Sequence, residues 1–587
     1  MHLISNSNKI VSIIINWIKK IFQKIKNLVI DLFSLLIIGL TVGCTLGLVS
    51  NLFIKGVATI TNFRKSYFLD FIDPSFIPVF SLLIAATLII LIRKVFNITR
   101  WHGPPDSILA AHQSNNSIDV KRGFGSTLTA FISASGGASV GQYGPLVHFG
   151  ATMATFLENF TSKRLPPGIF IGCGVAAAIS AGFNAPIAGL VFAHEAILRH
   201  FSLRAGGAIA ISSITASTVG AGFFNEVIGL EIISEAPKLI EITPIVLICS
   251  PIFGILAILF MFSIRSGARL SKASGLSPSY QIIIAALVCG IIGIFIPEIL
   301  GLGMQEMNAI YSAQYEIIFL LFIMIGKIFM TSLCIGFGFF GGIFAPALYV
   351  GAAGGGLFAK LLMLLGFSVS LPAMALAGTA AVGAVAIGAP IATTLIILEF
   401  TGSYEFAVAA MIAVQVSTFI SHRLYGDSLF DMALNDRGIN IGLGRQHVQM
   451  DDLPLTKILS NEAITFPENT SIKEVSRKMT INSATEAVII SNENKYKGKI
   501  SIYDIIKSKI NESEKIVSLI DSSHLVLDYK ISLVKSIEEA SNFVGEFIPV
   551  KNFENNDYIG SINESDLFQA YLKLQSQVLN VEKDTKN

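Results

Sequence analysis

The chain has 587 residues, of which 52% are hydrophobic and 14% charged, and its mean hydropathy is +0.66. This composition is too apolar for a soluble globular protein of this length and indicates a polytopic membrane protein. The formal net charge is +2, and the five cysteines lie in apolar runs without paired or metal-ligand spacing. Neither a disulfide framework nor a metal site is therefore expected, and nucleic acid is not an expected partner.

The first predicted region is residues 1–30, which carry five lysines and no acidic residue, with Ile, Val, Trp and Phe between the lysines. Excess basic residues are typical of the cytoplasmic side of a membrane protein, so we expect this end in the cytoplasm. Residues 10–30 fit an amphipathic helix at the membrane surface or, equally, a helix packed against the rest of the protein. A cleavable signal is not indicated, because lysines interrupt the apolar runs.

The second predicted region is residues 31–440, an all-α membrane domain. Several of its apolar runs are close in length to the roughly 20 residues that a helix needs to cross the hydrocarbon of a bilayer. These runs cover residues 32–54, 76–92, 242–264, 282–296 and 317–335. The apolar pieces between them are shorter and are interrupted by Gly, Pro and Asn, which predicts partial or tilted spans.

Two interruptions stand out, Gly-Gln-Tyr-Gly-Pro at residues 141–145 and Gly-Ile-Phe-Ala-Pro at residues 342–346. Each breaks an apolar stretch and then restarts a helix, and a first-turn proline such as Pro145 or Pro346 suits a helix start. Irregular backbone inside a bilayer persists only where it lines a cavity or is buried in protein. The unpaired N–H groups of a helix start attract anions. The alternative is that Gly and Pro only kink packed helices.

The two interruptions belong to an internal repeat. Gly125, Pro145, Gly150 and Ala151 recur 201 residues later as Gly326, Pro346, Gly351 and Ala352. Ala-Pro-Ile-Ala at residues 185–188, followed by Glu195, recurs 204 residues later at residues 389–392, followed by Glu399. The domain therefore consists of two halves, about residues 32–224 and 242–433, and interrupted segments in repeated halves indicate a binding site near the bilayer midplane. The repeat leaves open whether the halves are parallel or inverted.

The third predicted region is residues 441–587, where the hydropathy falls and a soluble tail begins. Short β-rich runs at residues 486–491 and 499–503 alternate with helical patterns at residues 472–479 and 534–544. Residues 498–504 and 560–566 repeat at a spacing of 62, each predicted as a strand that runs into a helix capped by an aspartate, Asp504 or Asp566. The tail is thus predicted to be a tandem pair of small α/β units.

A family resemblance rests on three motifs that occur in one order. They are Phe-Asn-Ala-Pro at residues 183–186, Gly-Lys at Gly326 and Lys327, and Gly-Gly-Ile-Phe-Ala-Pro at residues 341–346. With them the chain resembles the CLC family of chloride channels and chloride/proton antiporters over nearly all of its membrane part, and the tail resembles a pair of CBS domains. The resemblance implies two inverted repeats with broken helices, and a homodimer with one pore per subunit. It also implies a central anion held by helix N-termini and by a serine and a tyrosine hydroxyl.

The anion contacts that the resemblance implies begin with the amides of Ile343 and Phe344, whose motif is intact. The family's Gly-Ser-Gly-Ile-Pro corresponds to residues 101–105, which puts His102, followed by Gly103, where the coordinating serine belongs. An imidazole can donate a hydrogen bond and, when protonated, adds a positive charge. The alternative is that His102 only caps or packs near the turn.

Other family positions are changed in this chain. Tyr143, followed by Gly144 of the same candidate site, replaces the glutamate that serves the family as gate and proton carrier. A tyrosine ionises only far above neutral pH, so it can offer its hydroxyl or obstruct the path but cannot copy the carboxylate. Ala196 replaces the inner proton-relay glutamate, whereas the neighbouring Glu195 is interpreted as structural. Phe430 stands at the place of the coordinating tyrosine, with Tyr425 as the alternative donor.

These residues predict passive conduction of chloride or another small anion through a channel. The alternatives are an anion/proton antiporter with a route through His102, His148 or His194, and a non-conducting membrane sensor that works through its tail. An enzyme is not expected, because no nucleophile, metal cluster or phosphate-binding loop has a suitable spacing. No resident cofactor is expected. The CBS resemblance implies an adenine nucleotide with Asp504 and Asp566 at its ribose, or plain helix caps at these positions, in a cytoplasmic tail.

Overall fold

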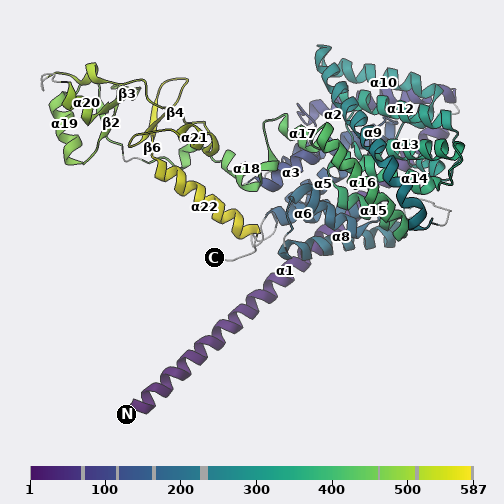
Figure 1. Ribbon diagram of the computed structural model, residues 1–587, viewed down its shortest axis with the longest axis horizontal. Coiled ribbons are helices and arrows are strands. Elements are labelled where there is room, and N and C mark those ends of the chain that lie inside the picture. The colour runs from purple at the N-terminus through teal and green to yellow at the C-terminus, as the bar shows by residue number, and fades with distance from the viewer. Residues whose placement is uncertain are drawn as a thin grey trace. The chain divides into compact units, whose positions relative to one another are not determined.

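The computed structural model describes residues 2–67, 73–113, 118–160, 167–201, 203–224, 236–460, 463–508 and 514–582. The chain separates into two compact units (Figure 1). The membrane unit comprises Met1–Ala111 and Asn116–Gly438, and the tail unit comprises His112–Asn115 and Ile439–Asn587. Each unit is built around cores of its own, and each is described separately below.

The membrane unit is helical throughout its described residues. Its first half contains α1 (His2–Tyr67), η2 (Pro74–Phe76), α2 (Ile77–Val95), α3 (Pro104–His112), α4 (Val120–Gly136), α5 (Tyr143–Glu158), α6 (Pro167–Phe183), α7 (Pro186–Phe192), the π-helical turn η3 (Ala193–Leu198) and α8 (Leu203–Phe224). Its second half contains α9 (Leu239–Ala273), α10 (Pro278–Phe295), η4 (Pro297–Ile299), α11 (Met304–Tyr311), α12 (Ile317–Gly336), α13 (Phe344–Leu364), α14 (Leu371–Ile387), α15 (Pro390–Thr401), α16 (Tyr404–Leu424) and α17 (Leu429–Asn435).

Long and short helices alternate in this unit, as the interrupted apolar pattern predicts. Among the described residues, 8 segments are long and apolar enough to cross a membrane, and α2, α9, α10 and α12 cover the runs predicted from residues 76, 242, 282 and 317. Four further apolar segments have 10–17 residues. At 1.5 Å per residue, a helix of about 17 residues is about 26 Å long, which is less than the roughly 30 Å thickness of the hydrocarbon core. The chain is thus a multi-pass membrane protein with partial spans.

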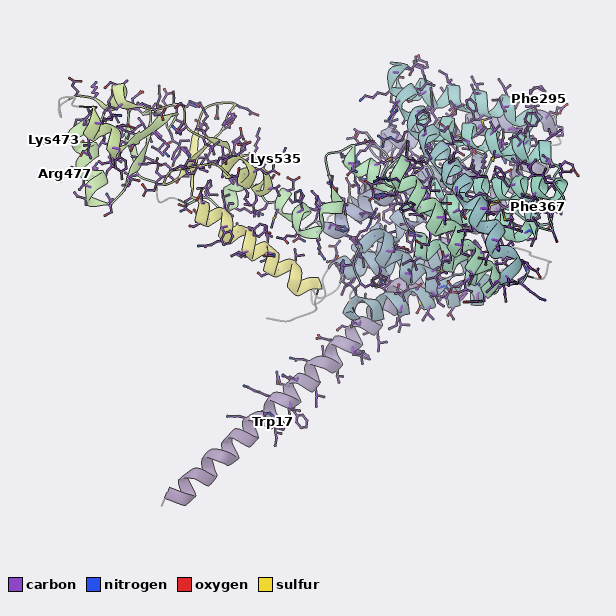
Figure 2. The ribbon with its side chains drawn as sticks, viewed as in Figure 1. Trp17, Phe295, Phe367, Lys473, Arg477 and Lys535 are labelled. Carbon is purple, nitrogen blue, oxygen red and sulfur yellow. The ribbon has the colours of Figure 1, made fainter. Side chains whose placement is uncertain are left out.

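The N-terminal helix is longer than the sequence pattern indicates. The sequence suggests a surface segment over residues 1–30 and a separate span over residues 32–54, but α1 continues through both without a break. Residues 2–38 contain neither Gly nor Pro, so no residue there interrupts the helix. The side chains of Trp17, Phe22 and Phe33 on this part of α1 are exposed (Figure 2). The proposed boundary at residue 30 therefore does not coincide with a helix end.

The two halves repeat the same packing, and equivalent glycines bring equivalent helices into contact. A Cβ atom added to Gly150 of α5 would lie 2.3 Å from the carbonyl oxygen of Gly174 in α6. In the second half, a Cβ atom on Gly351 of α13 would lie 2.2 Å from the carbonyl oxygen of Gly378 in α14. Backbones this close leave no room for a side chain, which is the small-residue packing typical of membrane helices. The repeated glycines thus fix the positions of α5 and α13.

The halves also exchange carboxylate caps. The backbone N–H groups of Ile187 and Ala188, at the start of α7, donate to the two carboxylate oxygens of Glu399 over 2.9 and 2.8 Å. The corresponding groups of Ile391 and Ala392, at the start of α15, donate to Glu195 over 2.9 and 2.8 Å. Each carboxylate satisfies two N–H groups that have no helical partner. The pair thereby links the two repeats.

The tail unit holds two small sheets of the same topology. Its elements are η5 (Ile441–Leu443), α18 (Arg445–Asp451), η6 (Leu455–Lys457), β1 (Thr465–Pro467), α19 (Ile472–Ile481), β2 (Glu486–Ile490), β3 (Tyr496–Ser501), α20 (Ile502–Lys507), η7 (Ile516–Leu519), β4 (Leu527–Asp528), α21 (Leu533–Ala540), β5 (Ile548–Lys551), β6 (Tyr558–Ile562) and α22 (Glu564–Glu582). The strand orders are β1-β2-β3 and β4-β5-β6, and in each sheet the first pair is parallel and the second antiparallel.

One detail of the predicted tail is wrong. The helices after β3 and β6 are not capped by Asp504 and Asp566. Ser501 caps α20 by accepting from the Tyr503 N–H, and Asn563 accepts from the Asp566 N–H at the start of α22. The aspartates lie in the first turn instead, where a negative charge still suits the helix dipole.

Candidate anion-binding site

A cavity of about 290 Å³ opens where the interrupted segments of the membrane unit meet. Its wall is formed by the segment before α3, the starts of α5 and α13, one side of α9 and the short helix α17. Five of the predicted site residues line it, namely Gly103, Gly144, Ile343, Phe344 and Phe430. The structure therefore brings together residues that lie up to 327 positions apart in the chain, from Gly103 to Phe430.

The two interrupted segments are hydrogen-bonded to each other at repeat-equivalent glycines. The Gly141 N–H donates to the Gly342 carbonyl over 2.7 Å, and the Gly342 N–H donates to the Gly141 carbonyl over 2.6 Å. A Cβ atom on Gly342 would lie 2.8 Å from the nitrogen of Gly144, so a side chain does not fit there. This bridge holds the start of α5 beside the start of α13.

The start of α13 has free backbone donors. Its first helical bond runs from the Ala347 N–H to the Ile343 carbonyl, and no side chain caps the helix. Within the described part of the chain, the N–H groups of Ile343 and Phe344 donate to no acceptor. Unpaired N–H groups at the positive end of a helix attract an anion without a cationic side chain. The cavity wall at this point therefore carries unpaired backbone donors, and anion binding by them stays a prediction.

Tyr143 is fully enclosed at the start of α5, beside the cavity. Its ring stacks on Phe183, the last residue of α6, with 3.7 Å between ring centroids, and meets the edge of Phe344 at 6.4 Å. Its hydroxyl has no hydrogen-bond partner among the described residues, nor does the side-chain oxygen of Gln142. A buried phenol normally finds a partner, because an unmade hydrogen bond costs about 1–3 kcal/mol. The Tyr143 hydroxyl is thus unpaired and enclosed, and Tyr143 itself is not among the residues that line the cavity.

The segment before α3 differs from the prediction. The Gly103 N–H donates to the Oδ2 atom of Asp106 over 2.9 Å, and the His102 N–H donates to the Ser126 hydroxyl over 3.1 Å. The next two residues are prolines, which have no N–H. Although Gly103 lines the cavity, its amide already has an acceptor, so an anion would have to displace the Asp106 carboxylate. Gly103 as an anion-binding residue stays a prediction, and its amide is engaged by Asp106 in this structure.

His102 also departs from its expected place. Its side chain does not line the cavity, although both neighbours, Trp101 and Gly103, do. The ring instead lies 6.2 Å from the ring of His148 on α5, and His148 shares a 2.8 Å hydrogen bond with the Ser107 hydroxyl. The second ring nitrogen of His148 is buried without a partner. The His102 ring therefore lies beside His148 and is not among the residues that line the cavity.

Phe430 lines the cavity as expected, and it brings no hydroxyl. Ser428 precedes it as the cap of α17: it accepts from the Asp431 N–H and donates to the Asp431 carboxylate over 2.7 Å. Tyr425, the alternative donor, packs on an apolar cluster around α9 and is not among the cavity residues. An aromatic ring therefore stands where the resemblance implies a hydroxyl.

The position of the missing relay glutamate is filled by an apolar side chain. Ala196 is fully buried in η3, and its carbonyl accepts from the Arg199 side chain over 3.1 Å. His194, in the same turn, stacks on Phe201 and contacts the Leu190 carbonyl over 3.0 Å. Neither residue lines the cavity.

Charged residues that the sequence analysis did not single out line the cavity in two pairs. Arg437 contacts Asp106 over 2.8 Å, and Asp106 also contacts Arg100 over 2.7 Å. Arg265 contacts Asp436 over 2.9 Å. One signal was present in the sequence: Asp106 stands three residues after Gly103, which is the spacing of a side chain that folds back to cap a helix start. The arginines carried no local signal.

Lys327 of the Gly-Lys motif is structural. It is fully buried in α12, and its ammonium donates to the Ile299 and Gly301 carbonyls over 3.2 and 2.8 Å. It lies away from the cavity residues. Within the described ranges, no three His, Cys, Asp or Glu side chains come together as metal ligands would.

Of the two tail aspartates expected to contact a nucleotide, Asp504 lines a pocket and Asp566 does not line it. Asp504 lines a pocket of about 480 Å³ with Lys507, Ser508 and Asp521. The Asp566 carboxylate accepts from the Asn563 N–H over 3.3 Å, so it is engaged at the start of its own helix. The two repeat-equivalent aspartates are therefore not equivalent in their contacts.

Comparisons with known proteins support the fold. A family model described as voltage gated chloride channel matches residues 85–422, and a CBS domain model matches residues 455–511. Similar curated proteins include the voltage-gated ClC-type chloride channel ClcB of Escherichia coli O17:K52:H18 (strain UMN026 / ExPEC), 27% identical over 353 residues, which are 59% of this chain and 84% of the relative. ClcB of Escherichia coli (strain K12 / DH10B) is 28% identical over 364 residues, with the same coverage.

Three solved structures have the same fold. A slow cyanobacterial Cl−/H+ antiporter has a TM-score of 0.62 and 20% identity over 69% of this chain and 97% of its own. A CLC-type fluoride/proton antiporter has a TM-score of 0.58 and 23% identity over 68% and 98%. A eukaryotic CLC transporter has a TM-score of 0.59 and 16% identity over 91% and 98%.

Proposed function

This chain belongs to the voltage-gated chloride channel family, whose members transport small anions across a membrane, and on that premise we propose that it conducts chloride or a similar anion passively. The observation that carries the proposal is Tyr143, an enclosed aromatic side chain at the helix start where a carboxylate would have to act as gate. Ala196 supports the same proposal, because it leaves the family's inner proton-relay position without a titratable side chain. Without carboxylates at these two positions, neither side chain can carry a proton across in exchange for the anion.

The proposed path begins at the cavity and ends against the aromatic stack. The free amides of Ile343 and Phe344 hold the anion, and Arg265 and Arg437, each paired with an aspartate, line the same cavity. Gly144 and Phe430 complete the wall of this site. Tyr143 and Phe183 then form the constriction, and a turn of the Tyr143 ring opens it while its free hydroxyl accompanies the anion.

The assembly and orientation follow from the family and the charge pattern. We propose two subunits with one pore each, with the N-terminus and the tail on the cytoplasmic side. The five lysines of residues 1–30 support that orientation. The proposed regions remain residues 1–30, 31–440 and 441–587, of which the last begins within three residues of the observed start of the tail unit at Ile439.

A second candidate is an anion/proton antiporter with its own proton route. His148 favours it, because one nitrogen of its buried ring has no partner and the ring of His102 is 6.2 Å away. Two of the structures with this fold are described as proton antiporters. His194 does not extend the route, because it lies on η3 away from the cavity.

The reversal potential of the purified protein in a lipid bilayer distinguishes the two. Under a chloride gradient at equal pH, both candidates give a potential that depends on chloride. When a pH difference is then added, a channel shows no shift, whereas an antiporter shows a shift because protons carry part of the charge. A shift with pH would contradict passive conduction, and a shift abolished by His148→Ala would identify the replacement route. Vesicles impermeable to every small halide would favour the sensor.

A further inference from the structure

A groove distinct from the anion cavity lies on the outside of the membrane unit, between the last turn of α2 and the first turn of α10. Its volume is about 420 Å³. Isoleucines from both helices form its apolar part, including Ile89 and Ile282, and Trp101 forms one wall. Arg93 and Lys94 contribute positive charge, and no acidic side chain lines it. The groove is therefore apolar at one end and cationic at the other.

The two cations differ in how they are held. The Arg93 side chain donates to the Ile98 and Thr99 carbonyls over 3.0 and 2.9 Å, and its guanidinium lies 5.6 Å from the centre of the Trp101 ring. These contacts fix the guanidinium at the groove. The Lys94 side chain is exposed, and among the described residues its ammonium has no acceptor. A fixed cation beside a free one, without a carboxylate, is complementary to a phosphate group.

The surroundings of the groove are those of a lipid-facing surface. Leu91 of α2 and Ile284 of α10, near the groove, are 57% and 37% exposed, and toward the far end of α10 Ile291 is 50% exposed and Phe295 lies at the outer surface (Figure 2). Arg93 and Lys94 follow directly after the apolar part of α2, where a membrane helix reaches the polar interface. Tryptophan is also enriched at that depth. The cationic end of the groove thus lies at headgroup level.

We propose that this groove binds an anionic phospholipid, with the headgroup phosphate between Arg93 and Lys94 and the acyl chains along the exposed faces of α2 and α10. Basic pockets between membrane helices are the usual form of such sites. A soluble phosphate would use the cations alone, whereas a lipid also covers the apolar part of the groove. The binding itself does not depend on how the protein conducts anions.

The groove and the anion cavity share one residue. Trp101 lines both, and its ring stacks on Phe340 of the anion cavity with 5.5 Å between centroids. A headgroup held by Arg93 therefore lies next to the wall of the anion path. We expect the anion flux to change with the fraction of anionic lipid in the bilayer.

Trp101 also provides the measurement, because the chain has two tryptophans and the other, Trp17, lies on the exposed part of α1. In the full-length Trp17→Phe protein, the tryptophan fluorescence comes from Trp101 alone. The protein is reconstituted in phosphatidylcholine vesicles with increasing brominated phosphatidylglycerol, or with brominated phosphatidylcholine as the neutral lipid. We expect quenching by phosphatidylglycerol at mole fractions too low for quenching by phosphatidylcholine.

A matched pair of variants tests the site. Lys94→Gln removes the free cation, and Lys272→Gln removes an exposed lysine that does not line the groove. We expect Lys94→Gln to weaken the preference for phosphatidylglycerol about fivefold, which corresponds to about 1 kcal/mol, and Lys272→Gln to leave it unchanged. Equal quenching by both lipids, or equal effects of both variants, would overturn the proposal. So would complete relief of the quenching by soluble glycerol phosphate, which would identify a phosphate site instead.

Discussion

The membrane unit has two pairs of interrupted helix starts, and the two pairs are completed in opposite ways. At the starts of α7 and α15, a glutamate from the other repeat accepts two backbone N–H groups. At the start of α13, and at the equivalent start of α5, no side chain caps the helix. The same local signal in the sequence, Gly or Ala before Pro, therefore yields a structural contact in one place and an uncapped helix start in another.

The difference shows what decides the role of a helix start in the membrane. A carboxylate held at the start neutralises the helix dipole and fixes the neighbouring repeat, so no anion is needed there. Where no carboxylate is present, the N–H groups keep their field and a mobile anion can satisfy them. Tyr143 leaves the N–H groups at the start of α5 without a neutralising charge, because its side chain adds bulk but no charge.

The largest expected effect follows from removing a carboxylate cap. Glu399→Ala leaves the Ile187 and Ala188 N–H groups unpaired, and Glu195→Ala does the same at Ile391 and Ala392. We expect each to lower the free energy of unfolding by about 2–3 kcal/mol, since hydrogen bonds to charged groups contribute about 1.5–3 kcal/mol. Thermal unfolding in detergent, followed by circular dichroism, measures the loss.

The control for these caps is Glu241→Ala, which removes an exposed glutamate from the first turn of α9. We expect a change below about 0.5 kcal/mol there, as for most surface substitutions. A large loss for only one of the two cap variants would contradict their reciprocal role.

The next effect follows from placing a carboxylate at an open helix start. Tyr143→Glu puts a negative charge at the start of α5, where it competes with the anion. We expect chloride efflux from liposomes to fall at least tenfold at pH 7.5 and to recover as the pH drops toward about 4, where the introduced carboxyl becomes neutral. Coupled exchange should not appear, because Ala196 still leaves the inner position without a carrier.

Tyr143→Phe is the matched variant, since it keeps the ring and removes the hydroxyl. Its efflux should show the pH profile of the unmodified protein. If Tyr143→Glu also kept that profile, the side chain at this position would not face the anion path.

The smallest effect concerns the missing hydroxyl on the cavity wall. Phe430→Tyr adds a donor beside Ile343 and Phe344, and we expect anion binding, measured by isothermal titration, to strengthen about threefold, or about 0.6 kcal/mol. Tyr425→Phe should change nothing, because Tyr425 does not line the cavity. The reverse pattern would identify Tyr425 as the donor.

Much of this architecture was predictable because the repeat spacing is a property of the sequence. The offsets of 201 and 204 identify the paired glycines, the paired glutamates and the two helix starts before any coordinates. The tail was predictable for the same reason, since its two strand-to-helix units repeat at a spacing of 62. A repeated local pattern folds twice into the same structure.

Side-chain direction was not predictable, because it depends on contacts between distant segments. His102 stands at the expected place in the chain but lies beside His148, and Gly103 donates to Asp106 rather than to the cavity. The stack of Tyr143 on Phe183 joins α5 to the end of α6. No periodic pattern in the sequence indicates these contacts, so they become visible only in the packed structure.

The bridge between Gly141 and Gly342 limits how this protein can move. Its two bonds, of 2.7 and 2.6 Å, join the two halves at buried backbone groups, where a broken hydrogen bond is costly. Rocking the halves apart at this point would leave four backbone polar groups without their partners. We therefore expect the two glycines to stay paired during transport, and the proposed path to open through rotamer changes of single aromatic rings.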